Sequence, residues 1–276
     1  MDSNNMAITI DFVGSSGIIL SPEQKASLQA SLCLLQHNNK FSKIYFWGKI
    51  MGVKDDYFIA QGANQDEMGM KKTFYSKDCV SWVLLNPATE ETKKQIQVIK
   101  GRFTGDPSHE FEHTEMKKGE GDEAPEEEST ITVKEEDRLA AVIEEIDHDV
   151  WIVPRGAFIK EPNGKVYKNR SFEGLPVSEA AKIGNYFHYR PAEQLEQKSL
   201  LQKANLDKSI DFLDSIDGDI PQGGSWSLQF ERGSALMTIR SLLWCGYTFF
   251  HVPCTSTFGS IYVGTGEKNK DLPFML

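Results

Sequence analysis

Residues 225–266 constrain the fold more than any other stretch, because they form short runs of apolar and polar side chains separated by breaks. Trp226 and Phe230 alternate with polar neighbours, which is the period of a half-buried strand. Gly233 and Gly246 fall where the chain has to reverse, and glycine readily adopts the positive φ that tight turns need. The pattern predicts a four-stranded antiparallel meander.

One run in this stretch, residues 241–252, is apolar on both strand faces, so something must cover both sides of it. Its second face is covered either by a partner chain or by the chain's own helices, predicted at residues 22–36 and around Leu139. We favour the partner, because large apolar patches often mark interfaces. The predicted partner contacts are Leu243, Trp244, Tyr247, Phe249, Phe250 and Tyr262. We also expect Trp226, Phe230, Trp244 and Phe249 to lie in the core of this region.

The first hundred residues predict helices and antiparallel hairpins. Ser21 and Gln24 form a capping box around Pro22, so a helix should begin there and end near residues 38–39. Strands are expected at residues 43–52, 57–62, 73–75 and 80–85, followed by a short helix over residues 89–99.

Acidic residues are concentrated in one part of the chain. The net charge is −10, and residues 115–150 alone hold 14 Asp and Glu against 4 Lys and Arg. The rest of the chain is therefore formally neutral, which argues against a nucleic acid or an anionic membrane as partner. Within this part, residues 118–129 have almost no apolar side chains, and we interpret them as a mobile acidic loop.

The second half also predicts helices and hairpins. Thr132 and Glu135 spell a capping box ahead of a helix with Leu139 on its apolar side. Residues 162–164 are a turn between two short strands. We therefore expect an α+β fold in which antiparallel sheets pack with a few helices. The expected organisation is an N-terminal α+β lobe (1–114), an acidic loop or linker (115–130) and a C-terminal α+β lobe with the meander (131–276).

Length and composition suit a protein of the cytoplasm. A chain of 276 residues can bury a substantial core, and it contains no apolar run long enough to span a membrane. Its start lacks the basic and apolar regions of a secretory signal. The four scattered cysteines fit a reducing compartment.

Two groups of residues could carry chemistry, and each has a structural alternative. Cys245, His251 and Cys254 lack the spacing of a known zinc site, so we interpret them as sheet cysteines and a satisfied core histidine. Residues 109–113 match the letters of H-E-x-x-H, but Pro107 precedes them and no helical apolar face follows. We expect an extended segment there, and we predict no metal, cofactor or catalytic site.

Several segments resemble proteins of the radial spoke head family. They are residues 46–50 (FWGKI), 56–62 (DYFIAQG), 100–103 (KGRF), 106–107 (DP), 153–157 (VPRGA), 225–246 and the tail 262–276 (YVGTGEKNKDLPFML). The resemblance covers nearly all of the chain from about Phe41 onward. It implies a non-enzymatic subunit of the axoneme in motile cilia and flagella, without cofactor. The implied partners are other radial spoke head subunits, namely the longer head paralogues, and projections of the central pair apparatus.

Two other functions stay open at this point. One is a cytosolic enzyme of an unrecognised class that uses His109 or the region of Cys245 and His251. The other is an assembly factor that meets axonemal parts only in the cytoplasm. Retention in washed axonemes separates a spoke subunit from an assembly factor, and elemental analysis for bound metal tests the enzyme.

Overall fold

The computed structural model describes residues 1–276 except 18–19, 97–98, 100, 118–126, 234 and 276. The helices are α1 (Met6–Thr9), α2 (Pro22–Asn39), α3 (Glu90–Ile96), α4 (Glu135–Val150), α5 (Val177–Ala180) and α6 (Leu200–Ala204). The strands of the first half are β1 (Lys43–Ile50), β2 (Tyr57–Ala63), β3 (Lys72–Ser76), β4 (Val83–Leu84), β5 (Glu110–Lys117) and β6 (Glu127–Lys134). The strands of the second half are β7 (Ile152–Pro154), β8 (Phe158–Lys160), β9 (Val166–Lys168), β10 (Tyr186–His188), β11 (Trp226–Glu231), β12 (Leu236–Ser241), β13 (Tyr247–His251) and β14 (Phe258–Gly264).

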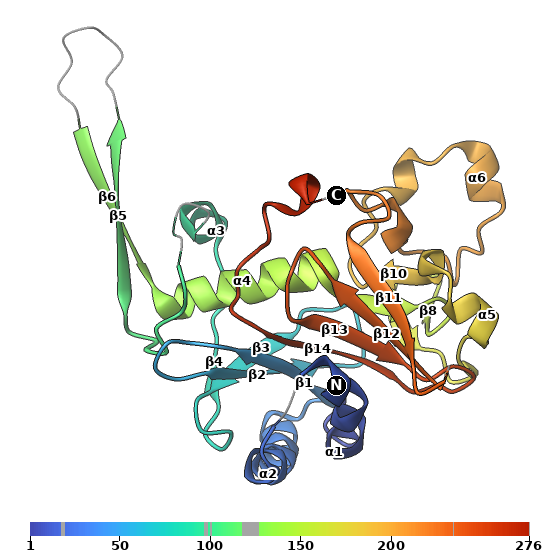
Figure 1. Ribbon diagram of the computed structural model, residues 1–276, viewed down its shortest axis with the longest axis horizontal. Coiled ribbons are helices and arrows are strands. Elements are labelled where there is room, and N and C mark those ends of the chain that lie inside the picture. Colours follow the sequence, from blue (N-terminus) through green and yellow to red (C-terminus); the bar gives the residue numbers. More distant parts are fainter. Residues whose placement is uncertain (18–19, 97–98, 100, 118–126, 234, 276) are drawn as a thin grey trace, which may run out of the picture.

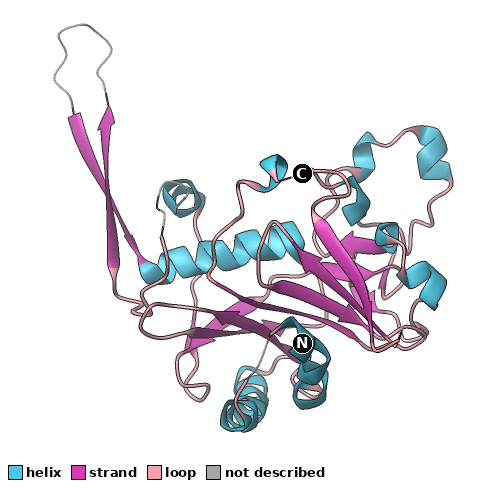
Figure 2. Cartoon of the chain, in the orientation of Figure 1, coloured by secondary structure: helices cyan, strands magenta, loops and turns pink. Residues whose placement is uncertain are grey.

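An eight-stranded sheet in the order β11-β12-β13-β14-β1-β2-β3-β4 is the centre of the fold (Figure 1; Figure 2). The last four strands of the chain form the predicted meander, with antiparallel pairing from β11 to β14. Short separate hairpins, β5–β6 and β8–β9, and the pair β7–β10 surround it. This mixture of helices and mainly antiparallel sheet confirms the α+β class.

The two halves of the sheet meet where β14 runs parallel to β1. Gly48 pairs with Tyr262 at this seam and has a φ of 145°. A β carbon at Gly48 would lie 2.0 Å from the Tyr262 carbonyl oxygen, so only glycine lets the two backbones approach this closely. Strands from both expected lobes thus share one sheet, and the division into domains stays a prediction.

One face of the sheet is covered by the N-terminal helices. Leu28 and Leu32 of α2 have no exposed surface and pack with side chains of α1 and of the sheet, including Phe46 and Phe250. The predicted capping box is confirmed, since the Gln24 amide donates to Ser21 Oγ and the Ser21 amide donates to Gln24 Oε1, each at 3.1 Å.

The opposite face is covered by α4, which crosses the sheet below α3 (Figure 1). Its apolar side, with Leu139, Ile143 and Ile146 almost fully buried, packs on Trp47 and Tyr262. Helices of the chain itself therefore cover both faces of the sheet. The favoured expectation was that a partner chain covers the second face; the structure shows the alternative, in which the chain's own helices cover it.

The start of α4 differs from the sequence-based prediction. Thr132 lies in β6, and Lys134 is the residue that precedes the helix, without a side-chain cap. The capping box is wrong because the Glu135 carboxylate accepts hydrogen bonds from other parts of the chain.

The expected acidic linker is in part a β-ribbon. Residues 115–117 belong to β5 and residues 127–130 to β6, which pair in register from Glu110↔Lys134 to Lys117↔Glu127. The run from Thr130 to Val133 is rich in β-branched side chains, which favour strands. Residues 118–126 of the expected mobile loop lie outside the described residues.

Candidate interaction surfaces

The six predicted partner contacts are placed mostly inside the chain. Trp244, Tyr247, Phe249, Phe250 and Tyr262 are each at most 1% exposed. Phe250 packs on the side of α2, and the other four pack on the side of α4. Leu243 is half-buried, so it is the member of the set that a partner could contact without rearrangement of the core.

The core predictions for the meander are confirmed for three of four aromatic residues. Trp226 is 7% exposed, while Trp244 and Phe249 are buried. The prediction for Phe230 is wrong, since 38% of its surface is exposed. Phe230 lies on β11, the edge strand of the sheet, where only one neighbouring strand is present.

The residues that could have carried chemistry lie in two kinds of environment. Cys245 and Cys254 are exposed in turns outside the strands, so their interpretation as sheet cysteines is wrong. His251 has no exposed surface; its Nε2 accepts a hydrogen bond of 3.1 Å from the Leu175 amide, and its Nδ1 lies 3.2 Å from the Thr257 carbonyl oxygen. Burial lowers the pKa of His251, with the Thr257 carbonyl acting in the opposite direction. The interpretation of His251 as a satisfied core histidine is confirmed, and its neutral form is the one that fits here.

His109 directly precedes β5 and the other four letters of H-E-x-x-H fall on that strand, which confirms the expected extended segment. The His109 ring instead packs edge-on against Phe111 at 4.8 Å between centroids. Among the described residues, no three His, Cys, Asp or Glu side chains gather as metal ligands. Within the same residues, no helix is both long and apolar enough to cross a lipid bilayer.

A buried carboxylate fixes the loop that precedes β5. Glu135, fully buried at the first position of α4, accepts hydrogen bonds from the Tyr57 hydroxyl at 2.7 Å and the Gly105 amide at 2.8 Å. Its other oxygen accepts from the amide and hydroxyl of Thr104, at 2.8 and 2.7 Å. Helix, sheet and loop are thus joined through one side chain, to which the sequence pattern had assigned the role of a helix cap instead.

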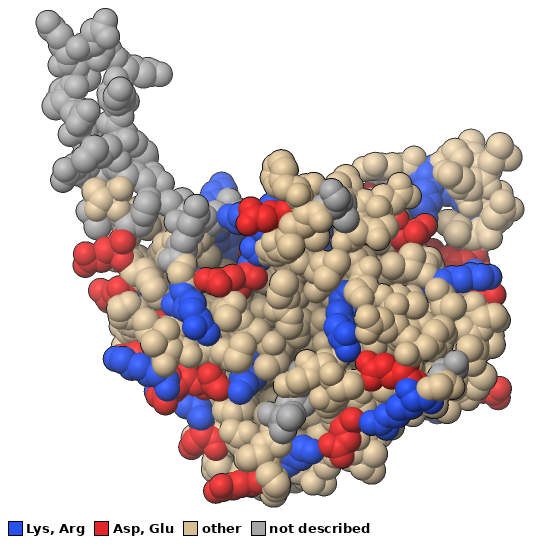
Figure 3. Space-filling view, viewed as in Figure 1, with Lys and Arg blue, Asp and Glu red and all other residues tan. Residues whose placement is uncertain are grey.

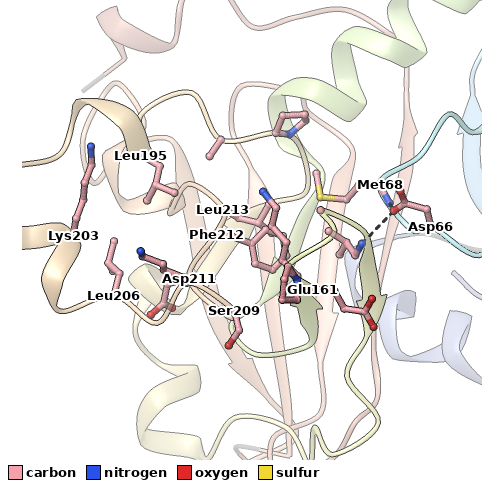
Figure 4. Close-up of a pocket in the computed structure, with 17 residues that line it drawn as sticks. Asp66, Met68, Glu161, Leu195, Lys203, Leu206, Ser209, Asp211, Phe212 and Leu213 are labelled. Atoms are coloured by element: carbon pink, nitrogen blue, oxygen red, sulfur yellow. Dashed lines mark hydrogen bonds between the residues drawn. The ribbon is translucent and has the colours of Figure 1, made fainter.

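A surface cavity of about 1000 Å³ lies between the β8–β9 hairpin and residues 191–213 (Figure 4). Met68, Phe212 and Leu213 supply apolar surface, and Lys160 Nζ lies 5.9 Å from the centre of the Phe212 ring. Asp211 at its edge is 4% exposed and binds Arg155 through two bonds of 2.6 and 2.7 Å. The cavity is thus lined by both apolar and charged side chains, a mixture that suits contact with a protein surface.

The β5–β6 ribbon projects away from the body as an arm (Figure 1). Neither of its strands pairs with a third strand among the described residues, so both of its edges are open. On the body, acidic and basic side chains are interspersed over the face shown in Figure 3.

Comparison with known proteins decides the family. Residues 1–167 match the protein family described as "Radial spokehead-like protein". The chain belongs to this family. Curated relatives named "Radial spoke head protein 9 homolog" are 52% identical in Mus musculus and Homo sapiens and 54% identical in Danio rerio. Each similarity covers all of this chain and all of the relative.

The family match covers elements that precede the meander in the sequence. It spans β1 to β4, the arm, α4 and the β8–β9 hairpin up to Tyr167. The meander lies beyond it, but the full-length relatives include this part of the chain as well. Membership of the radial spokehead-like family, predicted from the sequence segments, is thereby confirmed.

Proposed function

We propose that this chain is a non-enzymatic structural subunit of the radial spoke head in the axoneme of motile cilia and flagella. The observation that carries the proposal is the similarity of 52–54% identity, from end to end, to relatives named radial spoke head protein 9 homolog. In this role the chain supports the mechanical signal that passes between the outer doublets and the central pair.

The structure agrees with a role in assembly. The two histidines that could have suggested catalysis serve the fold, since both ring nitrogens of His251 have hydrogen-bond partners and His109 packs against an aromatic ring. The surface offers features suited to protein contacts, namely the arm and the cavity beside Phe212. The proposed partners are other spoke head subunits, in particular the longer head paralogues, and projections of the central pair apparatus.

The test is extraction and purification of native axonemes. Axonemes are washed with detergent and then with salt, and the fraction that holds this chain is measured. A spoke subunit stays with the axoneme after detergent and co-purifies with other head subunits from the salt extract. Recovery of the chain only in the detergent-soluble fraction would favour a cytoplasmic assembly factor instead.

A further inference from the structure

The arm is an incomplete sheet. β5 and β6 each contribute eight residues and pair along their whole length, yet they form a separate two-stranded sheet. A two-stranded hairpin alone is marginally stable in water, whereas a third strand or a packed helix stabilises it. Its open edges also present backbone donors and acceptors to any extended chain that approaches.

The base of the arm, by contrast, is firmly attached to the body. The Arg138 guanidinium of α4 lies 4.5 Å from the centre of the Phe103 ring and 4.9 Å from that of Phe111. The Glu135 amide donates a hydrogen bond of 2.8 Å to the His109 carbonyl oxygen, and Val133 is 3% exposed. These contacts hold the start of β5 and the end of β6 against α4.

The arm also continues directly into the helix that covers the sheet. β6 ends at Lys134 and α4 begins at Glu135, with no residue between them. A load on the arm therefore acts on α4 without an intervening loop. The structure thus combines a fixed base with a projecting part whose strand edges are unpaired.

Charge indicates what kind of chain the arm accepts. The two strands hold Glu110, Glu112, Glu115, Glu127 and Glu128 against Lys117 and Lys134. In a strand, alternate residues share a face, and the pairing places Glu110 and Glu112 on the same face as Lys134, which lies opposite Glu110. All three side chains are exposed, and over the two strands glutamates outnumber lysines by five to two. An acidic ribbon favours a partner with lysine or arginine and repels an acidic one.

We propose that the arm, residues 110–117 and 127–134, is a docking strand pair that receives an extended, basic segment of a partner protein as a third strand. Backbone hydrogen bonds along the free edge supply the binding, and the glutamates select the basic segment. This inference rests on the proposed function, because it names how the chain contacts a neighbouring subunit of the same assembly.

The experiment compares the free chain with the assembled one by hydrogen exchange. In the isolated chain, the arm amides that point away from the β5–β6 pairing should exchange quickly. In spoke heads purified from axonemes, amides on one free edge should exchange at least tenfold more slowly. Equal exchange rates of the arm amides in both samples would overturn the proposal.

Two variants test the contact in cells that lack the endogenous chain. In the first, an Asn-Gly turn replaces residues 114–130, which shortens the arm but keeps the pairs from Glu110↔Lys134 to His113↔Ile131. The second is Glu110→Lys with Glu112→Lys, two exposed glutamates of one face, and Glu23→Lys with Glu91→Lys on α2 and α3 is its matched control. Both arm variants should lose most of their retention in axonemes while they melt as the wild type does in isolation, and the control should be retained.

The outcomes separate the two proposals. Failure of the wild-type chain to co-purify with spoke heads would count against the proposed function itself. Retention of the wild type together with full retention of the shortened arm would reject the docking role alone. Normal retention of the charge-reversed arm would reject the basic partner.

Discussion

The hydroxyl of Tyr57 donates a hydrogen bond of 2.7 Å to the carboxylate of Glu135, and both side chains are completely buried. Tyr57 begins β2, Glu135 begins α4, and the bond joins the sheet to the helix that covers it. Together with the bonds from Thr104 and Gly105, it gives a buried carboxylate four donors. Such a group is tolerated in a core because its hydrogen-bonding capacity is met.

We expect Glu135→Gln to destabilise the protein by about 1–3 kcal/mol. The glutamine side chain has an NH2 group in place of one accepting oxygen, and this donor would face other donors. Urea unfolding of the two proteins measures the difference. Asp137→Asn is the matched control, since Asp137 is exposed in the same helical turn. Equal losses for the two variants would show that the helix start, and not the buried network, is responsible.

Trp244→Ala should cost about 3–5 kcal/mol, the usual range for a large aromatic residue in a core. Trp244 is 1% exposed, and its indole nitrogen donates to Asp149 Oδ2 at 2.9 Å. Thermal melts of this variant and of Phe274→Ala, whose side chain is 87% exposed, make the comparison. An unchanged melting temperature for Trp244→Ala would contradict its assignment to the core.

His251 predicts a loss of stability in mild acid. Burial lowers its pKa from 6.5 in the folded state, so below about pH 6.5 the unfolded chain binds a proton that the folded chain does not. Stability is therefore fully present above the unfolded pKa and falls as the pH drops through it, by up to about 1.4 kcal/mol per pH unit.

The measurement is urea unfolding at pH 7.5 and at pH 5.5. His251→Gln should lower stability at pH 7.5 and reduce the difference between the two pH values. His37→Gln, at an exposed position of α2, is the matched control and should keep the wild-type difference. An equally steep pH dependence in His251→Gln would assign the effect to another group.

The strands were predictable because their signals are local. Alternation and turn residues placed β11 to β14 and β1 to β3 close to their observed bounds, and Ser21 with Gln24 placed the start of α2. The parallel pairing of β1 with β14 could not be predicted in the same way. It depends on the fit of two distant backbones at Gly48, which no local pattern encodes.

The partner contacts were harder to predict, for a physical reason. A strand that is apolar on both faces requires cover on both faces, but its sequence does not say which chain supplies the cover. For Trp244 and Phe250 the cover comes from α4 and α2 of the same chain. The arm gave no apolar signal, since its hydrogen bonds lie in the backbone and its side chains are largely polar.

The acidic residues 118–126, which follow β5 and precede β6 in the sequence, should be dispensable for folding. Residues 118–126 contain only Ala124 and Pro125 as apolar residues, so they have little surface to bury. We expect the melting temperature to stay unchanged when an Asn-Gly turn replaces these residues between the paired Lys117 and Glu127. Thermal melts and solubility assays measure this. A lower melting temperature or a lower solubility would show that residues 118–126 contribute to folding.

The isolated chain should be a folded monomer. An apolar sheet face left uncovered would favour self-association, yet α2 covers one face and α4 the other. We expect a single species in sizing chromatography and a cooperative thermal transition. A longer head paralogue should then raise the melting temperature only through mass action, as any ligand of the folded state does.

A variant that uncovers one face supplies the control. Leu28→Asp with Leu32→Asp places two charges where α2 contacts the sheet, at side chains that have no exposed surface. Burial of unpaired charges is costly, so α2 should detach and leave Phe46 and Phe250 in contact with water. This variant should self-associate while the wild type stays monomeric. If the isolated wild type self-associates to the same degree as the variant, the chain's own helices do not protect the sheet.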